Sequence, residues 1–382
     1  MKIANATVYL LDLTLRTPFT TSFGTATTLR RPYVLLKTKD GRRGLGEIPT
    51  LPDPAYKAEV DHPAVLTSLR EFILPAAARG QAERCEIGDI AALRASYAWI
   101  KGAVFAKSGV EAALWDLLAQ EQGQSLWRMW SGTRRSFPVG VSIGGKTLNQ
   151  VLDLADNAVG LGYQRLKVKI WPGFDIEPAR ALRERFPDIL LQVDANSAYD
   201  LSNWERLKDL DGLDLLLIEQ PLYDDDIYLH SRISRDIRTP ICLDESVHSL
   251  RDAETAIALW GDLASTRLII NIKPPRVSGY AEAIAIAERC ATSGVQTWIG
   301  GMLDSAWGKA MNLNLNTLDP ITLPGDHFSP GGAYFVEDLT TAPLACDSGV
   351  FTIGNGVSAG VEIDWERFDR LAECQFVTEF ME

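Results

Sequence analysis

The pattern of apolar and polar residues divides the chain near residue 126. Before this point, alternating apolar positions in "ATVYLLDLTL" and "PYVLLKTKDGRRGLGEI" predict strands, the second folded as a hairpin at Asp40–Gly41. Apolar residues at helical spacing in "HPAVLTSLREFILPAAA" and "KSGVEAALWDLLAQEQG" predict helices, and Gly123 is expected to end the second. Residues 1–125 are therefore expected to form an α+β unit.

From residue 126 onward, short β-branched strands alternate with helical segments. The predicted strands are "FPVGVSI", "QRLKVKI", "ILLQVDAN", "LLLIEQP", "PICLDES", "LIINIKP" and "QTWIGGM". Their carboxyl ends recur every 25 to 29 residues between Lys169 and Gly301, which is the length of a strand–helix unit. Seven or eight such units predict a closed (β/α) barrel over residues 126–339. An open doubly wound sheet is the alternative, although no glycine fingerprint for dinucleotides follows the first strand.

The alternation fades after residue 340. The segment "GVFTIGNGVSAGVEID" has the alternating apolar residues and glycines of a β-hairpin. We expect the remaining tail, within residues 340–382, to return to the first unit.

Composition and charge exclude several classes of partner. The 382 residues carry a net charge of −12, and a surface that acidic repels nucleic acid and anionic membranes. No apolar run approaches a membrane span, and "MKIANATVYLLDL" alternates like a strand instead of a signal peptide. Five widely spaced cysteines without a CxxC motif favour free thiols in a reducing cytoplasm; they are Cys85, Cys242, Cys290, Cys346 and Cys374.

Five consecutive predicted strands end in an ionisable residue: Lys169, Asp194, Glu219, Asp244 and Lys273. Each has an ordinary role when considered alone, such as a helix N-cap for Asp194 or Asp244. Together they converge, because the carboxyl ends of parallel strands share one face of a barrel. Three carboxylates at one place repel each other unless a cation holds them. Hard oxygen ligands without Cys or His suit Mg²⁺, with Mn²⁺ as a substitute.

The stretch "LKVKI" places two lysines in a strand that is otherwise apolar. Side chains at i and i+2 share a face, so Lys167 and Lys169 are expected to point together into the barrel mouth. Lys273 comes from a strand four units later and is expected to face Lys169 across the site. Nearby positive charges would lower the pKa of Lys169 and make it a better base.

Two lysines beside a metal site suit removal of a proton α to a carboxylate, with the metal stabilising the developing charge. The segments "KVKIWPGFDIEP", "LLQVDANSAYDL", "LLLIEQPL", "RTPICLDESV", "NIKPPRVSGY" and "ITLPGD" resemble the enolase superfamily. More narrowly, they resemble its o-succinylbenzoate synthase / N-succinylamino acid racemase branch. The resemblance covers nearly the whole chain and is strongest over 163–326. It implies a modified (β/α)₇β barrel at 126–339 under a capping domain at 1–125, which residues 340–382 join.

Site roles follow from the resemblance by position. It implies that Asp194, Glu219 and Asp244 bind the metal. It also implies that Lys169 and Lys273 are the bases on opposite faces of the substrate carbon.

Other residues are expected to surround the substrate. Lys167 would contact the substrate carboxylate, with Asn196 beside it and Glu245 and Arg276 behind the ligands and bases. An arginine three residues after Lys273 could depress the pKa of that lysine. The remaining candidates come from the mobile-looking "TTSFGTA", from "PDPAYKAE", from the first barrel strand and from "GGMLD"; they are Phe23, Tyr56, Ser142, Gly301, Met302 and Asp304. Asp304 stands where the branch commonly has Glu.

The sequence leaves the reaction open between two activities that need the same residues. These are the dehydration of o-succinylbenzoate synthase, a step of menaquinone biosynthesis, and the racemisation of N-succinylamino acids. A dipeptide epimerase or a muconate-lactonising enzyme of the same superfamily is the alternative, and a metal-free Schiff-base lyase is a remoter one. The resemblance implies a small-molecule carboxylate substrate and a homo-oligomer, with no nucleic-acid or membrane partner, in the cytoplasm.

Overall fold

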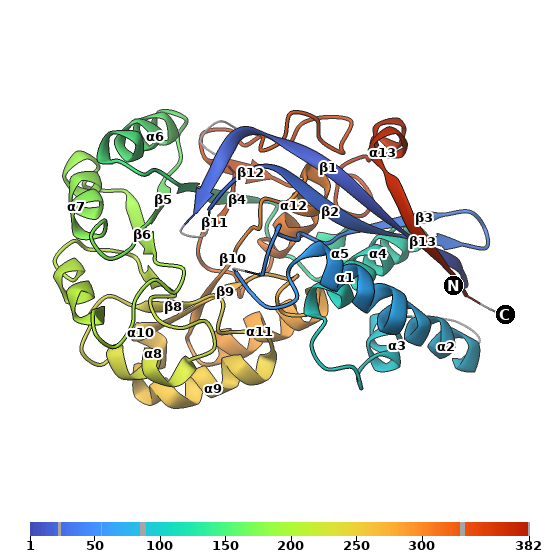
Figure 1. The fold of residues 1–382 in the computed structure, drawn as a ribbon, viewed down its shortest axis with the longest axis horizontal. Helices are drawn as coiled ribbons and strands as arrows, with labels where there is room; N and C mark the ends of the chain where they lie inside the picture. The colour runs from blue at the N-terminus through green and yellow to red at the C-terminus, as the bar shows by residue number, and fades with distance from the viewer. Residues whose placement is uncertain (22–23, 55, 85–88, 329–332, 381–382) are drawn as a thin grey trace.

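The structure, a computed structural model, describes residues 1–21, 24–54, 56–84, 89–328 and 333–380. One part is a four-stranded antiparallel sheet in the order β13-β1-β2-β3. Its long β1–β2 ribbon extends across the barrel that forms the rest of the molecule (Figure 1). The strand bounds are β1 (Ile3–Thr21), β2 (Gly24–Thr38), β3 (Arg43–Glu47) and β13 (Glu373–Glu379).

Helices cover this sheet and share a hydrophobic core with it. The predicted hairpin at Asp40–Gly41 is confirmed, because β2 pairs with β3 from Tyr33 to Lys37. The second predicted helix ends at Gly123, as predicted, in the left-handed conformation at φ +59. The helices are α1 (His62–Ser68), the π-helical turn η1 (Leu69–Ile73), α2 (Leu74–Arg84), α3 (Ile90–Ser96), α4 (Val104–Gln122) and α5 (Leu126–Met129).

The larger part is a parallel barrel whose strands follow the order β10-β9-β8-β7-β6-β5-β4-β11. The barrel closes between the two strands at the ends of this order, β10 and β11. There the N–H of Leu323, just before β11, donates to the carbonyl of Thr297 in β10 at 3.1 Å. The barrel prediction is therefore confirmed and the open sheet is wrong. The strands are β4 (Ser136–Ile143), β5 (Arg165–Lys169), β6 (Leu190–Asp194), β7 (Ile218–Glu219), β8 (Ile241–Leu243), β9 (Leu268–Ile272), β10 (Gln296–Ile299) and β11 (Gly325–Phe328).

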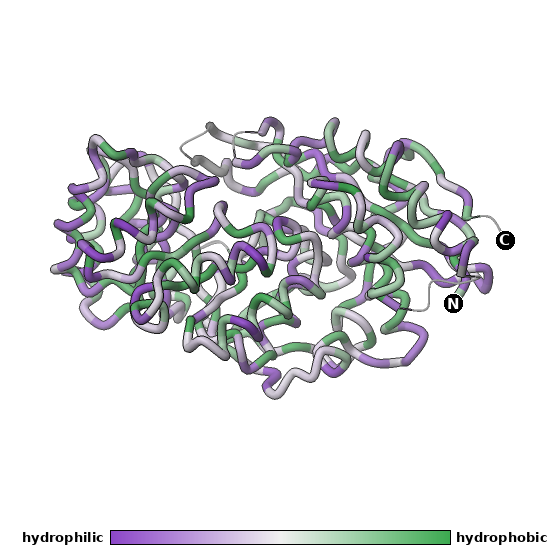
Figure 2. The backbone as a smooth tube through the Cα atoms, turned by 90° about the horizontal axis from the view of Figure 1, so that it is seen from below, coloured by the Kyte–Doolittle hydropathy of each residue, from purple (hydrophilic) through white to green (hydrophobic). Residues whose placement is uncertain are grey.

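Amphipathic helices surround the barrel. For example, the first of them buries Val151, Ala155 and Ala158, which recur on one helical face. Hydrophobic and hydrophilic stretches accordingly alternate along the outer tube in Figure 2. Among the described residues, no helix is long and apolar enough to cross a membrane. The helices are α6 (Leu148–Gly160), α7 (Ile176–Arg185), η2 (Trp204–Leu210), α8 (Ile227–Ile233), α9 (Leu250–Trp260), η3 (Gly261–Leu263), α10 (Ala264–Arg267), α11 (Tyr280–Thr292) and α12 (Ala306–Leu315).

The C-terminal segment differs from its prediction in one respect. The segment from Gly349 to Asp364 does not fold as a hairpin, because β12 (Val350–Thr352) pairs antiparallel with barrel strand β4. After α13 (Trp365–Leu371), β13 pairs antiparallel with β1 at the edge of the first sheet. The exact domain boundaries stay a prediction.

Two buried charged residues of the first sheet hold the loop after β10. The Arg31 guanidinium is fully buried and donates to the carbonyls of Met302 and Leu303 at 2.7 and 3.1 Å. Glu47 accepts from the backbone N–H of Ser305, the N-cap of α12, at 3.1 Å and also from its hydroxyl. The cap thus positions a loop that, as shown below, forms part of the pocket wall.

This interface predicts a pH dependence of stability. Burial raises the pKa of the Glu47 carboxyl from 4.5 to about 7, against the opposing charge of Arg31. The unfolded chain ionises first, so folding stability is lost as the pH rises from about 4.5 to about 7, by on the order of 3 kcal/mol. Glu47→Gln removes this term. Urea unfolding gives the free energy of unfolding of this variant minus that of the parent, and this difference should increase from pH 5 to pH 8. A difference that stays constant would contradict this pH dependence.

Candidate active site

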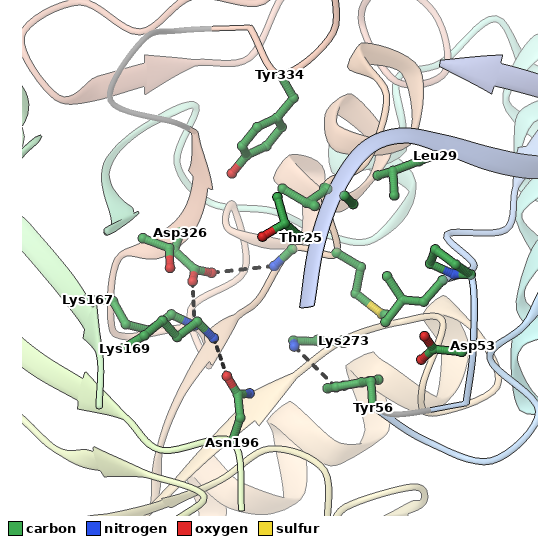
Figure 3. A pocket seen from close by; sticks show the side chains of 17 residues that line it. Thr25, Leu29, Asp53, Tyr56, Lys167, Lys169, Asn196, Lys273, Asp326 and Tyr334 are labelled. Carbon is green, nitrogen blue, oxygen red and sulfur yellow. Dashed lines mark hydrogen bonds and ion pairs between the residues drawn. The ribbon is translucent and has the colours of Figure 1, made fainter. Parts of the chain in front are cut away.

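A pocket of about 280 Å³ lies at the carboxyl ends of the barrel strands, under the cap. Figure 3 shows Lys167 and Lys169 entering from one side, whereas Lys273 lies beside Tyr56 and the side chains of Leu29 and Tyr334 approach from elsewhere. The cap side contributes Thr25, Ala26, Leu29, Leu51, Pro52, Asp53 and Tyr56. The barrel and C-terminal side contributes Ser142, Lys167, Lys169, Asn196, Lys273, Gly301, Met302, Leu303, Asp326 and Tyr334.

Lys167 and Lys169 both project from β5 into this pocket, as their spacing predicts (Figure 3). The Lys167 ammonium lies 3.1 Å from Asp194 and 3.1 Å from Glu219. It also lies 2.6 Å from Asp326, the second residue of the last barrel strand, β11. The Lys169 ammonium donates to the same Asp194 oxygen at 2.6 Å. One buried and one partly buried cation thus share one carboxylate, which explains how a core strand can carry two lysines.

Asn196 connects this group to the next acid. Its backbone has φ +41, a conformation that Asn tolerates better than most residues. Its side-chain oxygen accepts from Lys169 at 2.6 Å, and its nitrogen donates to Glu245 at 3.0 Å. Its backbone N–H donates to Asp194 at 3.0 Å. Asn196 therefore fixes the direction of the Lys169 ammonium.

Lys273 stands at the opposite side of the pocket on the end of β9. Its ammonium donates to Asp244 Oδ2 at 2.8 Å and to the Tyr56 hydroxyl at 3.2 Å. The Tyr56 hydroxyl in turn donates to Asp244 Oδ1 at 3.2 Å. The fully buried Arg276 guanidinium also binds Asp244 Oδ1. Asp244 is therefore shared by two cations and a phenol that reaches down from the cap.

The acids of the site differ in how readily they ionise. Burial would raise the pKa of Asp194, but the charges of Lys169 and Lys167 outweigh it and lower that pKa. Burial, followed by the charge of Asp194, raises the pKa of Glu219. The same two causes raise the pKa of Glu245 to about 7. A divalent cation among these oxygens would favour their ionised forms.

Two lysines of the site, Lys167 and Lys273, have raised pKa values. Burial would lower the pKa of Lys273, but the charges of Tyr56 and Glu245 outweigh it and raise that pKa. The carboxylates around Lys167 likewise outweigh its burial and raise its pKa. The guanidinium of Arg276 and the ammonium of Lys273 bind different oxygens of Asp244, and the predicted effect of Arg276 on the Lys273 pKa stays a prediction.

The three predicted metal ligands fit a divalent cation by donor type. Asp194, Glu219 and Asp244 are buried carboxylates on adjacent strands, and oxygen donors of this kind suit Mg²⁺ or Mn²⁺. In the described part of the chain, no three acidic, histidine or cysteine side chains already converge as a cage. Two further buried oxygens, Glu245 Oε2 and Asn271 Oδ1, have no hydrogen-bond partner among the described residues. The site thus contains several buried oxygen atoms, and two of them have no donor beside them among the described residues.

The predicted substrate contacts divide into three groups. Tyr56, Ser142, Gly301 and Met302 line the pocket. Asp304 does not; it is buried behind the wall and accepts from the Met302 N–H at 3.0 Å. Phe23 lies outside the described residues.

Several residues in the pocket or beneath it were missed, and some had a usable signal. Gln192 and Asn271 lie two residues before Asp194 and Lys273, so strand alternation places them on the same face. Asn271 donates to Glu219 at 2.8 Å from beneath. Asp326, the salt-bridge partner of Lys167, lies within the last barrel strand, β11. No local pattern marks the other missed residues, Thr25, Leu29, Asp53 and Tyr334, because they reach the pocket only through tertiary packing.

The fold and the site together define a barrel enzyme that takes a proton from the carbon next to a carboxylate. Residues 150–367 match the model for the enolase C-terminal domain-like family. Residues 4–130 match that for the N-terminal domain of mandelate racemase / muconate lactonizing enzyme. The chain belongs to the enolase superfamily, in its o-succinylbenzoate synthase / N-succinylamino acid racemase branch.

Relatives named o-succinylbenzoate synthase and relatives named N-succinylamino acid racemase both support this assignment. An o-succinylbenzoate synthase of Enterococcus faecalis is 36% identical over 380 residues, covering 98% of this chain and 99% of the relative. An N-succinylamino acid racemase of Amycolatopsis sp. is 39% identical over 363 residues, covering 94% and 95%. A solved enolase-superfamily structure from Listeria innocua superposes with a TM-score of 0.92 at 32% identity, covering all of both chains. The synthases of this superfamily depend on a divalent metal ion.

Proposed function

We propose that this chain removes the proton α to a substrate carboxylate, as an o-succinylbenzoate synthase, an N-succinylamino acid racemase, or both. The observation that carries the proposal is the pair Lys169 and Lys273, which enter one pocket from strands β5 and β9 on opposite sides (Figure 3). Each ammonium is anchored by a different carboxylate, Asp194 or Asp244. Such a pair can address both faces of a planar carbon, as an enolising enzyme requires.

The roles that we assign follow from these contacts. Mg²⁺, or Mn²⁺ in its place, would be held by Asp194, Glu219 and Asp244, and when bound it would stabilise negative charge on the substrate carboxylate. Lys169 removes the α proton, while Lys167 binds the carboxylate. The cap over the pocket excludes water from the substrate.

The two activities use the same lysines differently. In dehydration, Lys169 takes the α proton and returns it to the departing hydroxyl, while the Lys273 ammonium only stabilises the enediolate. In racemisation, Lys169 and Lys273 each act as the base for one enantiomer and as the acid for the other. Dipeptide epimerisation and muconate lactonisation remain the alternatives within the superfamily. The predicted homo-oligomer and cytoplasmic location stay predictions.

The direct test measures o-succinylbenzoate formation from its cyclohexadiene precursor, with Mg²⁺ and with EDTA. Metal-dependent turnover would establish the synthase and leave racemisation as a second activity. Absence of turnover would contradict the synthase assignment. Racemisation of N-succinylamino acids, measured under the same conditions, would then show whether the chain is a racemase.

Arg276→Met is expected to slow racemisation more than dehydration. Arg276 and Lys273 bind different oxygens of Asp244, so removing the guanidinium leaves that carboxylate to Lys273 alone. A stronger ammonium–carboxylate pair makes Lys273 a poorer base, which racemisation needs and dehydration does not. The expected loss in kcat/KM is about tenfold greater for racemisation. Arg276→Lys, which keeps the charge, serves as the control, and equal losses in both reactions would contradict the role.

A further inference from the structure

A loop of the cap, described at residues 51–54 and 56–60, carries Tyr56 into the catalytic group, and a hydrogen bond joins the two ends of the loop. The Leu51 N–H donates to the Val60 carbonyl at 3.1 Å. Next to this closure, the Glu59 carboxylate accepts from the Ala103 N–H at the start of α4. The two ends of the loop are therefore fixed to the cap. Its tip is held by side-chain contacts with the barrel instead.

The tip reaches the barrel through two neighbouring side chains. Tyr56 is buried, and its hydroxyl lies 3.2 Å from both Lys273 and Asp244. The next residue, Lys57, forms an ion pair with Asp224 at 2.5 Å and also lies 3.4 Å from the Asp224 carbonyl oxygen. The Lys57 side chain is 11% exposed and that of Asp224 is 45% exposed. One ion pair between cap and barrel thus adjoins, along the chain, the phenol that contacts the catalytic lysine.

The loop that carries Asp224 is itself tied to the strands of the site. Gln220, directly after Glu219, donates to the Tyr223 carbonyl at 3.1 Å. The same Gln220 side chain accepts from the Asp244 N–H at 2.9 Å. Because one amide connects both segments, Asp224 is held in a constant position relative to two of the proposed metal ligands. An ion pair to Asp224 therefore places the cap loop relative to the catalytic group.

We propose that Lys57 and Asp224 are positioning residues that latch the cap loop to the barrel and hold the Tyr56 hydroxyl on Lys273 and Asp244. The inference rests on the proposed function, because it assigns the latch to the same enolising site. The latch acts through Tyr56 and contacts no reacting atom. Its loss therefore changes the geometry of Lys273 through the Tyr56 hydroxyl.

The test compares Lys57→Met and Asp224→Asn with the charge exchange Lys57→Asp/Asp224→Lys. Each single variant should lower kcat/KM by between about 5-fold and about 100-fold, and the exchange should recover part of the loss. Asp225→Asn is the matched control, because the exposed Asp225 carboxylate forms no ion pair among the described residues. It should leave kcat/KM unchanged. Recovery by the exchange distinguishes a positioning pair from a side chain that only supports folding.

A second comparison shows whether the latch acts through Tyr56. In a Tyr56→Phe background, Lys57→Met should add less than about a third of its effect in the parent, since coupled residues are not additive. High salt should lower kcat/KM of the parent and leave kcat/KM of Lys57→Met unchanged, because salt screens the ion pair. A full, additive effect of Lys57→Met in the Tyr56→Phe background, or no effect in the parent, would overturn the proposal.

Hydrogen exchange of residues 51–60 tests the latch without substrate. Lys57→Met should speed exchange of these amides at an unchanged unfolding temperature, whereas Asp225→Asn should not. If the parent turned over neither substrate, the proposed function would fail while this exchange result still supported the latch. If the parent is active and exchange is unchanged in Lys57→Met, the latch fails alone.

Discussion

Lys169→Met is expected to lower kcat/KM for o-succinylbenzoate formation by about 10⁴-fold, the upper end of the contribution of one positioned acid–base group. Asn196 and Asp194 both hold the Lys169 ammonium at 2.6 Å, so no other amine can replace it without moving β5. Lys273→Met should also be strongly impaired, because its ammonium is the positive charge on the opposite face. A methionine fills a similar volume and leaves the strand packing intact.

Deuterium exchange separates the two lysines. With N-succinylamino acids in D₂O, each lysine variant should lose α-proton exchange of one enantiomer and keep measurable exchange of the other. The exposed Lys37→Met on the cap sheet is the control and should behave like the parent. If Lys169→Met instead lost α-proton exchange of both enantiomers to the same degree at an unchanged unfolding temperature, that result would contradict the assignment of one base to each face.

Glu219→Gln is expected to weaken Mn²⁺ binding by at least about 100-fold, since a lost ligand should cost no less than a lost supporting contact. The variant keeps the shape of the side chain and the hydrogen bond from Asn271, but removes one of three proposed anionic ligands. Calorimetric titration with Mn²⁺ measures the effect independently of turnover.

Stability should respond differently from metal binding in this variant. Burial and Asp194 raise the pKa of Glu219, so neutralising it relieves repulsion in EDTA. The Lys167 ammonium retains Asp194 and Asp326 as partners. The unfolding temperature in EDTA should therefore stay within a few degrees of the parent. Surface Glu205→Gln is the control; unaltered Mn²⁺ affinity in Glu219→Gln would contradict the role of Glu219 as a ligand.

The barrel could be predicted because its signal is local and repeated. Five consecutive predicted strands end at a charged residue at nearly constant spacing, and the strand period alone places Lys167 beside Lys169. The same period could also have placed Gln192 and Asn271 on the inner face of the barrel, where both donate to Glu219. A repeated unit compensates for uncertainty in any single strand, which is why the weak, two-residue β7 was still found.

The remaining features depend on contacts between distant segments. Tyr56 meets Asp244 across 188 residues, and the pairing of β12 with β4 joins side chains 216 residues apart. The segment around β12 has hairpin-like alternation, but its ladder partner is a barrel strand, so the local pattern predicted the wrong pairing. The salt bridges that raise the lysine pKa values are likewise invisible in a sequence that shows charges without their distances.

The most direct test of the central claim is α-proton exchange of both enantiomers of an N-succinylamino acid in D₂O, followed by mass spectrometry with Mg²⁺ and with EDTA. The account predicts exchange at the α carbon of both enantiomers, lost in EDTA and restored by Mg²⁺. Exchange that persists in EDTA, together with trapping of the substrate on a lysine by borohydride, would contradict metal-assisted enolisation and favour a Schiff-base lyase instead.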